Sequence, residues 1–205
     1  MAEIKKQVEY SEEIRKKIFE IEQELMKDHK LWDTDKRISE IKSTIRIFYK
    51  KEQKYLCSFC RKELSYISPS NCQVEHIVPK SLHPEFIFTE KNLCVICADC
   101  NHIKRNQETL KEIPNTLKNK SPKLYPRSSD AFLIVHPHFD YYDDHILIVN
   151  DEYYVNKSDK GNFTIGICKL NKKLYKDFQV DESILESEDI NEVCNAFNNE
   201  KDKGK

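Results

Sequence analysis

Residues 57–60 have the sequence CSFC, residues 97–100 have the sequence CADC, and 36 residues separate the two pairs. Two Cys-x-x-Cys turns offer four thiolates, which is the ligand set of a closed tetrahedral zinc site. Four protein ligands leave no open coordination position, so such a zinc holds the fold together and does not act on a substrate. We therefore predict a structural zinc bound by Cys57, Cys60, Cys97 and Cys100.

The composition describes a highly charged chain without a broad basic surplus. Of 205 residues, 34 are Lys or Arg and 35 are Asp or Glu, which gives a net charge of -1, and 39% are hydrophobic. No apolar run approaches the roughly 18 residues of a membrane span, and the N-terminus lacks the apolar core of a signal peptide. There are only 3 glycines and no GxGxxG or GxxxxGK[ST] motif, so we expect no nucleotide site. We expect a cytoplasmic protein with reduced or metal-bound cysteines.

Amphipathic helices are predicted before the first Cys pair. Ile and Leu recur at helical spacing from position 14 to 25, and an apolar stripe recurs from 38 to 48 after a break near 28–35. We therefore predict an N-terminal helical segment over residues 1–53. Its apolar stripes either pack on the rest of the protein or form an exposed face that docks a partner, and the sequence does not separate these alternatives.

Residues 54–112 alternate short apolar stretches with Cys, His, Pro and Asn. We predict a Cys turn, a strand around 72–74, a short apolar segment around 93–96 and a helix from about 99 to 111. A histidine between apolar residues is usually a core residue with a satisfied ring. Here, however, His76 follows an acid, precedes Pro79 by three residues and lies between the two Cys pairs.

In order and spacing, these elements resemble the HNH endonucleases, the ββα-metal nuclease superfamily, in the form with four cysteine ligands for zinc. The matching pattern, over about residues 55–106, is Cys-x-x-Cys, Glu75-His76-Ile-Val-Pro79, Asn92-Leu, Cys-x-x-Cys-Asn101 and Lys104. The resemblance implies an α+β fold with a zinc-stapled, treble-clef-like ββα-metal core. An N-terminal helical segment and a C-terminal α/β extension would flank that core.

The resemblance also implies a role for each matching residue. His76 would be the general base that deprotonates a water, a task that suits neutral imidazole. Glu75 and Asn101 would hold one Mg²⁺ or Mn²⁺ against the scissile phosphate, because carboxylate and amide oxygens favour hard cations. Asn92 would position the loop that presents His76. The expected phosphate contacts are Lys80, Lys104 and Arg105, with a solvated helix face as the alternative for the last two.

Three details of the match leave alternatives open. Asn101 stands where many members carry histidine, so metal affinity is expected to be modest, and His102 becomes the ligand if the helix begins one residue later. Glu75 replaces the commoner aspartate and reaches one methylene further. Cys94 and Cys97 form a second Cys-x-x-Cys pair, but pairing Cys97 with Cys100 keeps Asn101 and Lys104 in register. The predicted core thiols are Cys72, Cys94, Cys168 and Cys194.

Beyond the second Cys pair we predict a basic linker over residues 113–130 and an α/β extension over residues 131–205. The linker either tracks a phosphate backbone or is a solvated connector. In the extension, residues 131–135, 145–150 and 151–156 are strand-like, residues 161–171 begin a strand or a helix, and a helix is expected around 189–197. Four further residues could form a second metal cluster, but we prefer to place them at turn and surface positions: His136, His138, Asp140 and His145.

From Leu133-Ile-Val-His-Pro137 to Leu170-Asn171, the extension resembles more weakly the region after the HNH core in PtuB, the effector nucleases of the Septu anti-phage system. That resemblance implies an ABC-type ATPase partner and a role in defence. We predict a metal-dependent endonuclease that hydrolyses DNA. The same base and metal would serve RNA, so the catalytic residues do not choose between the polymers. The alternative from another class is a zinc-stapled module that binds nucleic acid or protein without catalysis.

Overall fold

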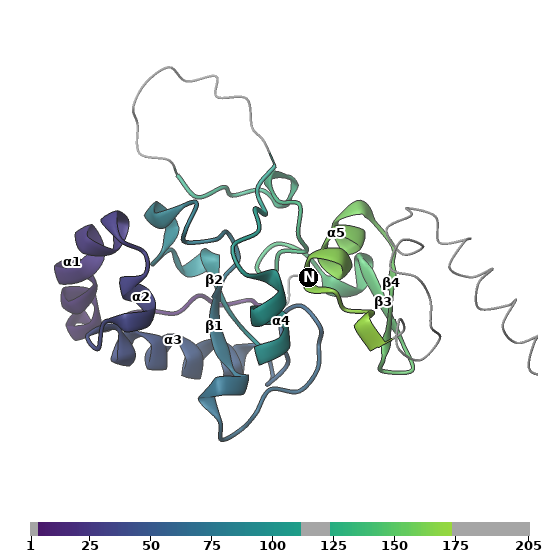
Figure 1. The fold of residues 1–205 in the computed structure, drawn as a ribbon, viewed down its shortest axis with the longest axis horizontal. Helices are drawn as coiled ribbons and strands as arrows, with labels where there is room; N and C mark the ends of the chain where they lie inside the picture. Colours follow the sequence, from purple (N-terminus) through teal and green to yellow (C-terminus); the bar gives the residue numbers. More distant parts are fainter. Residues whose placement is uncertain (1–3, 112–123, 174–205) are drawn as a thin grey trace, which may run out of the picture.

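The computed structural model describes residues 4–111 and 124–173; the helix predicted around 189–197, Cys194 and most of the predicted linker lie outside them. Figure 1 shows the N-terminal helices in purple and blue, a two-stranded sheet with a helix in teal, and a second hairpin with a helix in green. The fold is mixed α/β with two small antiparallel sheets among the described residues. None of the helices in this part of the chain is both long and apolar enough to cross a membrane.

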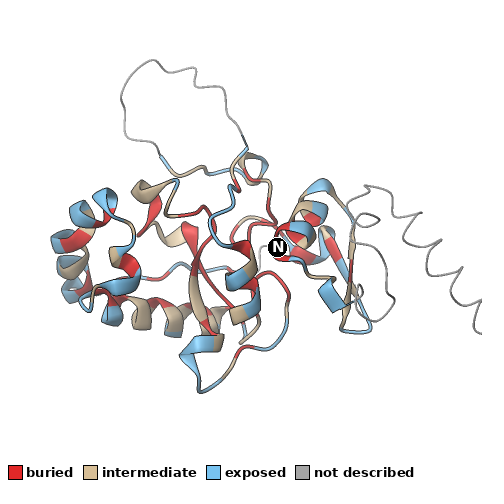
Figure 2. Ribbon diagram, in the orientation of Figure 1, coloured by how far each residue is buried: buried red, intermediate tan, exposed pale blue. Residues whose placement is uncertain are grey.

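Three helices precede the first Cys pair: α1 (Glu12–Lys27), α2 (Leu31–Thr34) and α3 (Ile38–Glu52). Helix α1 begins where Ser11 Oγ accepts a hydrogen bond from the amide of Ile14, and two glutamates in its first turn complement the helix dipole. The apolar stripes of α1 and α3 are buried in one core, as the red stripes of Figure 2 show, and α3 packs on both central strands. The stripes therefore pack on the rest of the protein.

A hairpin and a following helix form the centre of the molecule. Strand β1 (Gln73–His76) pairs antiparallel with β2 (Leu93–Ile96), and α4 (Ala98–Lys104) follows at once. The strand predicted around 72–74 begins one residue and ends two residues before the observed one, and the predicted helix to 111 was too long. The helix ends because Arg105 has a φ of 48°, which turns the chain out of the right-handed helical path.

Side chains distant in sequence complete the edge of β2 that faces away from β1. The side chain of Gln53, just after α3, both donates to and accepts from the backbone of Val95, each at 2.8 Å. His138 Nε2 donates to the carbonyl oxygen of Leu93 at 2.8 Å. Leu93 and Val95 are two residues apart in the strand, so their backbone groups point to the same edge. Strand β2 is consequently buried along its whole length.

The chain after residue 124 packs against the first Cys turn. It contains η5 (Tyr142–Asp144), the antiparallel strands β3 (Ile146–Val149) and β4 (Tyr153–Asn156), and α5 (Asp159–Cys168). Tyr142 Oη donates to the carbonyl oxygen of Phe59 at 2.8 Å, and Tyr154 Oη donates to that of Cys60 at 2.6 Å. Two tyrosines thus clamp the turn that carries the first two cysteines.

The strands and the helix predicted after residue 130 are confirmed in part. Residues 145–150 and 151–156 contain the predicted strands, but residues 131–135 form no strand. Their amides go to separate partners, Leu133 N to the carbonyl oxygen of Thr109 and Val135 N to Thr164 Oγ1, both at 2.8 Å, so no ladder forms. Residues 161–171 contribute to a helix, and its Gly161 packs so closely that an added Cβ would lie 1.9 Å from the carbonyl oxygen of His145.

Candidate functional site

Four cysteine side chains converge between the first Cys turn and the start of α4. Their Sγ atoms all lie within 4.8 Å of one another, and all four residues are buried. Cys60 Sγ and Cys97 Sγ are 3.7 Å apart, which matches the sulfur–sulfur edge of about 3.8 Å in a tetrahedron with Zn–S bonds of about 2.3 Å. The set fits a structural metal ion such as zinc. The predicted clustering of Cys57, Cys60, Cys97 and Cys100 is confirmed.

Two backbone amides donate hydrogen bonds to sulfurs of the cluster. Cys97 N donates to Cys57 Sγ at 3.4 Å, and Cys100 N donates to Cys97 Sγ at 3.5 Å. Hydrogen bonds from Cys100 first, and then from Cys57 and Cys60, lower the pKa of Cys97, whereas the pKa values of the three donors are raised. The four thiols thus share their protons around one sulfur that is already a thiolate, which is the form that binds a metal.

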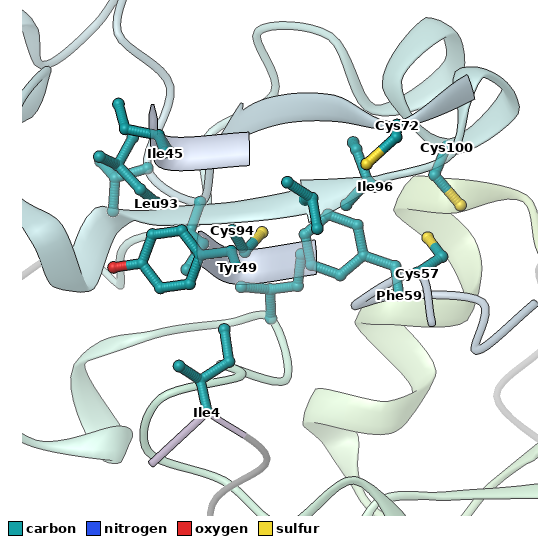
Figure 3. Packing of buried hydrophobic residues seen from close by; sticks show 14 of the residues in the cluster. Ile4, Ile45, Tyr49, Cys57, Phe59, Cys72, Leu93, Cys94, Ile96 and Cys100 are labelled. Carbon is teal, nitrogen blue, oxygen red and sulfur yellow. The ribbon is translucent and has the colours of Figure 1, made fainter. Parts of the chain in front are cut away.

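The remaining cysteines of the described residues lie outside the cluster. Cys72, Cys94 and Cys168 are buried, as predicted for core thiols. In Figure 3 the sulfurs of Cys57 and Cys100 face one another, whereas Cys94 lies apart on β2. The alternative pairing of Cys94 with Cys97 is therefore wrong. Cys168, at the end of α5, hydrogen-bonds to Cys100 without joining the cluster.

A cleft of about 360 Å³ brings together several predicted site residues. Glu75, Asn101 and Lys80 all line it. Asn101 Nδ2 hydrogen-bonds to Gln73 Oε1, which leaves its amide oxygen as the atom without a partner among the described residues. His102, by contrast, lines a different cleft beside the cysteines. Of the two possible metal ligands on α4, only Asn101 shares a cleft with Glu75.

His76 ends β1 beside this cleft, with its ring held from two sides. Its Nε2 lies 3.0 Å from the carbonyl oxygen of Ile87; a carbonyl only accepts, so Nε2 carries the proton and Nδ1 keeps the lone pair. The Trp32 ring, which also lines the cleft, meets it edge-on at 4.6 Å. Burial, and secondarily the charge of Lys80, hold the pKa of His76 well below 6.5. The imidazole is therefore neutral at pH 7.

Lys104 occupies a different environment from the expected phosphate contact. Its side chain is 0% exposed, and its ammonium lies 2.6 Å from Glu75 Oε1 and 3.2 Å from the carbonyl oxygen of His76. A buried ammonium requires a paired charge, and Glu75 supplies it. The lysine therefore braces the end of β1 from inside the protein. Arg105 is exposed, but its Nε donates to the carbonyl oxygen of His102 at 2.9 Å.

Asn92 holds the loop that connects the two central strands. It is 0% exposed, its Oδ1 accepts from Val78 N at 2.7 Å, and its Nδ2 donates to the carbonyl oxygens of Val78 and Phe86, both at 3.1 Å. Phe86 immediately precedes Ile87, whose carbonyl oxygen binds the ring of His76. The geometry agrees with a positioning role for Asn92.

A chain of hydrogen bonds extends this loop support into the C-terminal part. His138 N donates to His136 Nδ1 at 3.2 Å, so the proton of that ring is on Nε2, 2.9 Å from Tyr125 Oη. The Tyr125 hydroxyl can then donate to Asn92 Oδ1 at 3.2 Å. Burial lowers the pKa of His136 well below 6.5, which keeps this neutral proton pattern.

The second metal cluster considered for the C-terminal part is not assembled among the described residues. Of the preferred turn and surface positions, the turn is found at residues 137–139, but a surface position is wrong for His136, His138 and Asp140, which are buried, and His145 is half-buried. Asp140 instead accepts from His136 N at 2.7 Å, from Ser129 Oγ at 2.5 Å and from the ammonium of Lys160. Through these bonds the carboxylate of Asp140 stabilises the turn that begins at His136.

Three residues of the site were not identified from the sequence. Trp32 lies in the predicted break between helices, and being the only tryptophan was its sole signal. Gln73 precedes the motif by two residues, and Tyr125 lies in the predicted linker. Each reaches the site through tertiary packing, so no spacing rule singles it out.

No family model, no curated protein and no solved structure matches this chain. The metal-binding character of the cysteine cluster follows from its own geometry. The chemistry of the neighbouring cleft has to be argued from the residues that line it.

Proposed function

We propose that this protein is a metal-dependent endonuclease that hydrolyses phosphodiester bonds of nucleic acid, DNA first. One observation carries the proposal: His76 lies directly behind a cleft that Glu75 and Asn101 line, because it follows Glu75 in β1 and its ring meets the ring of Trp32, which also lines the cleft, at 4.6 Å. Lys42, Arg46 and Lys80 line the same cleft. Lys42 and Lys80 share Asp33 as an ion-pair partner at 3.2 and 3.4 Å, so three cations face that one carboxylate there and leave positive charge for a phosphate.

In this proposal His76 Nδ1 accepts a proton from a water whose oxygen attacks the phosphorus. The bond from phosphorus to the leaving sugar oxygen breaks, and that oxygen takes up a proton from solvent. Ile87 keeps the Nε2 proton in place throughout, so the nitrogen that faces the water stays basic. Such a general base contributes about 10²- to 10⁴-fold to the rate.

Glu75 and Asn101 fit a hard divalent cation, because a carboxylate and an amide oxygen are ligands that Mg²⁺ and Mn²⁺ accept. Glu75 Oε1 is paired with Lys104, which leaves Oε2 as the oxygen without a partner among the described residues. When bound there, a divalent cation neutralises charge on the phosphate and on the leaving oxygen. Lys104 fixes the carboxylate for that task and, being buried, does not contact the substrate.

The test is cleavage of labelled DNA and RNA by the purified zinc-loaded chain, with and without Mg²⁺ or Mn²⁺. His76→Ala should fold normally and reduce cleavage by about 10² or more. His29→Ala is the matched control, since His29 lies outside the cleft, between α1 and α2. Asn101→Ala should raise the Mg²⁺ concentration needed for half-maximal cleavage.

Cleavage by His76→Ala at the wild-type rate would overturn the proposal. Cleavage of RNA alone would keep the site and change the substrate. No cleavage of either polymer, with zinc bound at about one per chain, would favour the zinc-stapled binding module. The ATPase partner and the defence role rest on the weaker resemblance alone and stay predictions.

A further inference from the structure

A second cleft, of about 730 Å³, lies between the cysteine cluster, α4 and the end of α5. Cys60, Cys97 and Cys100 form part of its wall. Gln73 and Asn101 line both this cleft and the one that holds Glu75. The two clefts therefore adjoin at Gln73 and Asn101.

The rim of the second cleft is rich in lysine. Lys62, Lys169 and Lys172 line it, all three are exposed, and none makes an ion pair within the described part of the chain. Lys173 also lines it but pairs with Glu152. Asp99 is the one carboxylate among the described residues of the lining. A zinc ion held by four thiolates carries a net charge of about -2. Lys62, Lys169 and Lys172 therefore balance the negative charge of the wall, and their exposed ammonium groups place positive charge at the rim.

The lysines are held in place by the packing around the cysteine cluster. Lys169 ends α5 in the left-handed region with a φ of 45°, and its amide bonds back to the carbonyl oxygen of Gly166 at 3.0 Å. Asn171 exchanges two hydrogen bonds of 2.8 Å with the backbone of Tyr154. Because Tyr154 also bonds to Cys60, the segment 169–172 has a defined position relative to the cysteines.

We propose that a bound nucleic-acid strand runs from the Glu75 cleft past Asn101 into this second cleft, with its phosphates contacting Lys62, Lys169 and Lys172. The inference rests on the proposed function for the position of the scissile bond. Binding in the second cleft makes a separate claim, because these lysines belong to the first Cys turn and to the segment after α5, outside the residues that carry the chemistry.

A repeating polyanion fits the path better than a single anion. The cations of the two clefts are spread along it, with Lys42, Arg46 and Lys80 before Asn101 and the three lysines after it. Each lysine that neutralises a phosphate releases condensed counterions, so binding weakens steeply with salt. DNA and RNA share this backbone chemistry, and the measurement includes both.

The experiment measures binding of a labelled DNA or RNA strand by fluorescence anisotropy over a range of NaCl, without cleavage, in a His76→Ala background. The test variant is Lys62→Gln, Lys169→Gln and Lys172→Gln together. The matched control is Lys27→Gln, Lys36→Gln and Lys51→Gln, which removes the same charge from exposed helix and turn positions away from the clefts. Zinc content and far-ultraviolet circular dichroism check that both fold.

For a single strand, the slope of log K against log salt should fall by about 2 in the test variant, since each lost contact removes about 0.7. The control should keep the slope of the parent. An unchanged slope in the test variant, an equal loss in the control, or no binding by the parent would overturn the inference. Lysine-dependent binding without cleavage by the wild type would instead overturn the proposed function and leave the path in place.

Discussion

Replacing Asn92 by alanine should lower the free energy of unfolding by about 3 to 5 kcal/mol. Asn92 is 0% exposed. Its amide makes four hydrogen bonds, to Val78 N at 2.7 Å, to the carbonyl oxygens of Val78 and Phe86 at 3.1 Å, and to Tyr125 Oη at 3.2 Å. Each buried group left without a partner costs about 1 to 3 kcal/mol, and local relaxation brings the total below the simple sum.

The measurement is urea unfolding of the zinc-saturated protein at one fixed zinc concentration, because bound metal contributes to stability. Tyr125→Phe removes two hydrogen bonds, the one to Asn92 Oδ1 and the one with His136 Nε2, and should cost about 1 to 3 kcal/mol. Asn162→Ala is the matched control, since Asn162 is exposed on α5, and it should change stability by no more than about 0.5 kcal/mol.

The same variant should impair the chemistry proposed for His76. Phe86 loses its bond to Asn92, and the next residue supplies the carbonyl oxygen that orients the imidazole. A loss of stability below about 1 kcal/mol for Asn92→Ala, or a loss in Asn162→Ala of similar size, would refute the view that Asn92 holds this loop.

Three further predictions concern the cysteines, α5 and acid stability. Cys57→Ala should abolish zinc binding and unfold the core, because metal binding is part of the folding free energy, whereas Cys168→Ala should keep the metal. Metal analysis and circular dichroism measure both, and a folded, zinc-free Cys57→Ala protein would contradict the prediction. Gly161→Ala should cost about 1 to 3 kcal/mol in thermal unfolding through overpacking, whereas Gly166→Ala, with nothing within 4 Å of its added Cβ, should be neutral or stabilising; equal melting temperatures would refute the packing argument. Burial lowers the pKa of His138 from 6.5 to about 4, so between these values the unfolded state binds more protons and stability falls with falling pH, by up to about 1.4 kcal/mol per pH unit. His138→Gln should flatten that slope in urea unfolding between pH 7 and pH 4, and an unchanged slope rules the histidine out as its cause.

Local patterns in the sequence were sufficient for several elements. Helical spacing predicted α1 and α3, because an apolar stripe has to be buried and only a helix aligns residues three and four apart. The two Cys-x-x-Cys spacings predicted the metal-binding cluster, since each turn brings its two sulfurs to one side. The β-branched and aromatic composition of residues 145–150 and 151–156 likewise predicted β3 and β4.

Tertiary packing decided the rest. Lys104 was predicted to contact phosphate, with a solvated helix face as the alternative, and only the approach of α4 to β1 buries it against Glu75. Residues 131–135 have a strand-like composition, but their pairing stops at one isolated antiparallel bridge between Phe132 and Leu110, and Val135 N bonds to Thr164 Oγ1 instead, so no ladder forms. The support of the His76 loop by Tyr125 and His136 depends on groups 33 and 11 residues apart in sequence. The sequence by itself determined which side chains carry charge and metal-binding sulfur; the fold decided which of them face the cleft, because burial depends on neighbours that no local pattern contains.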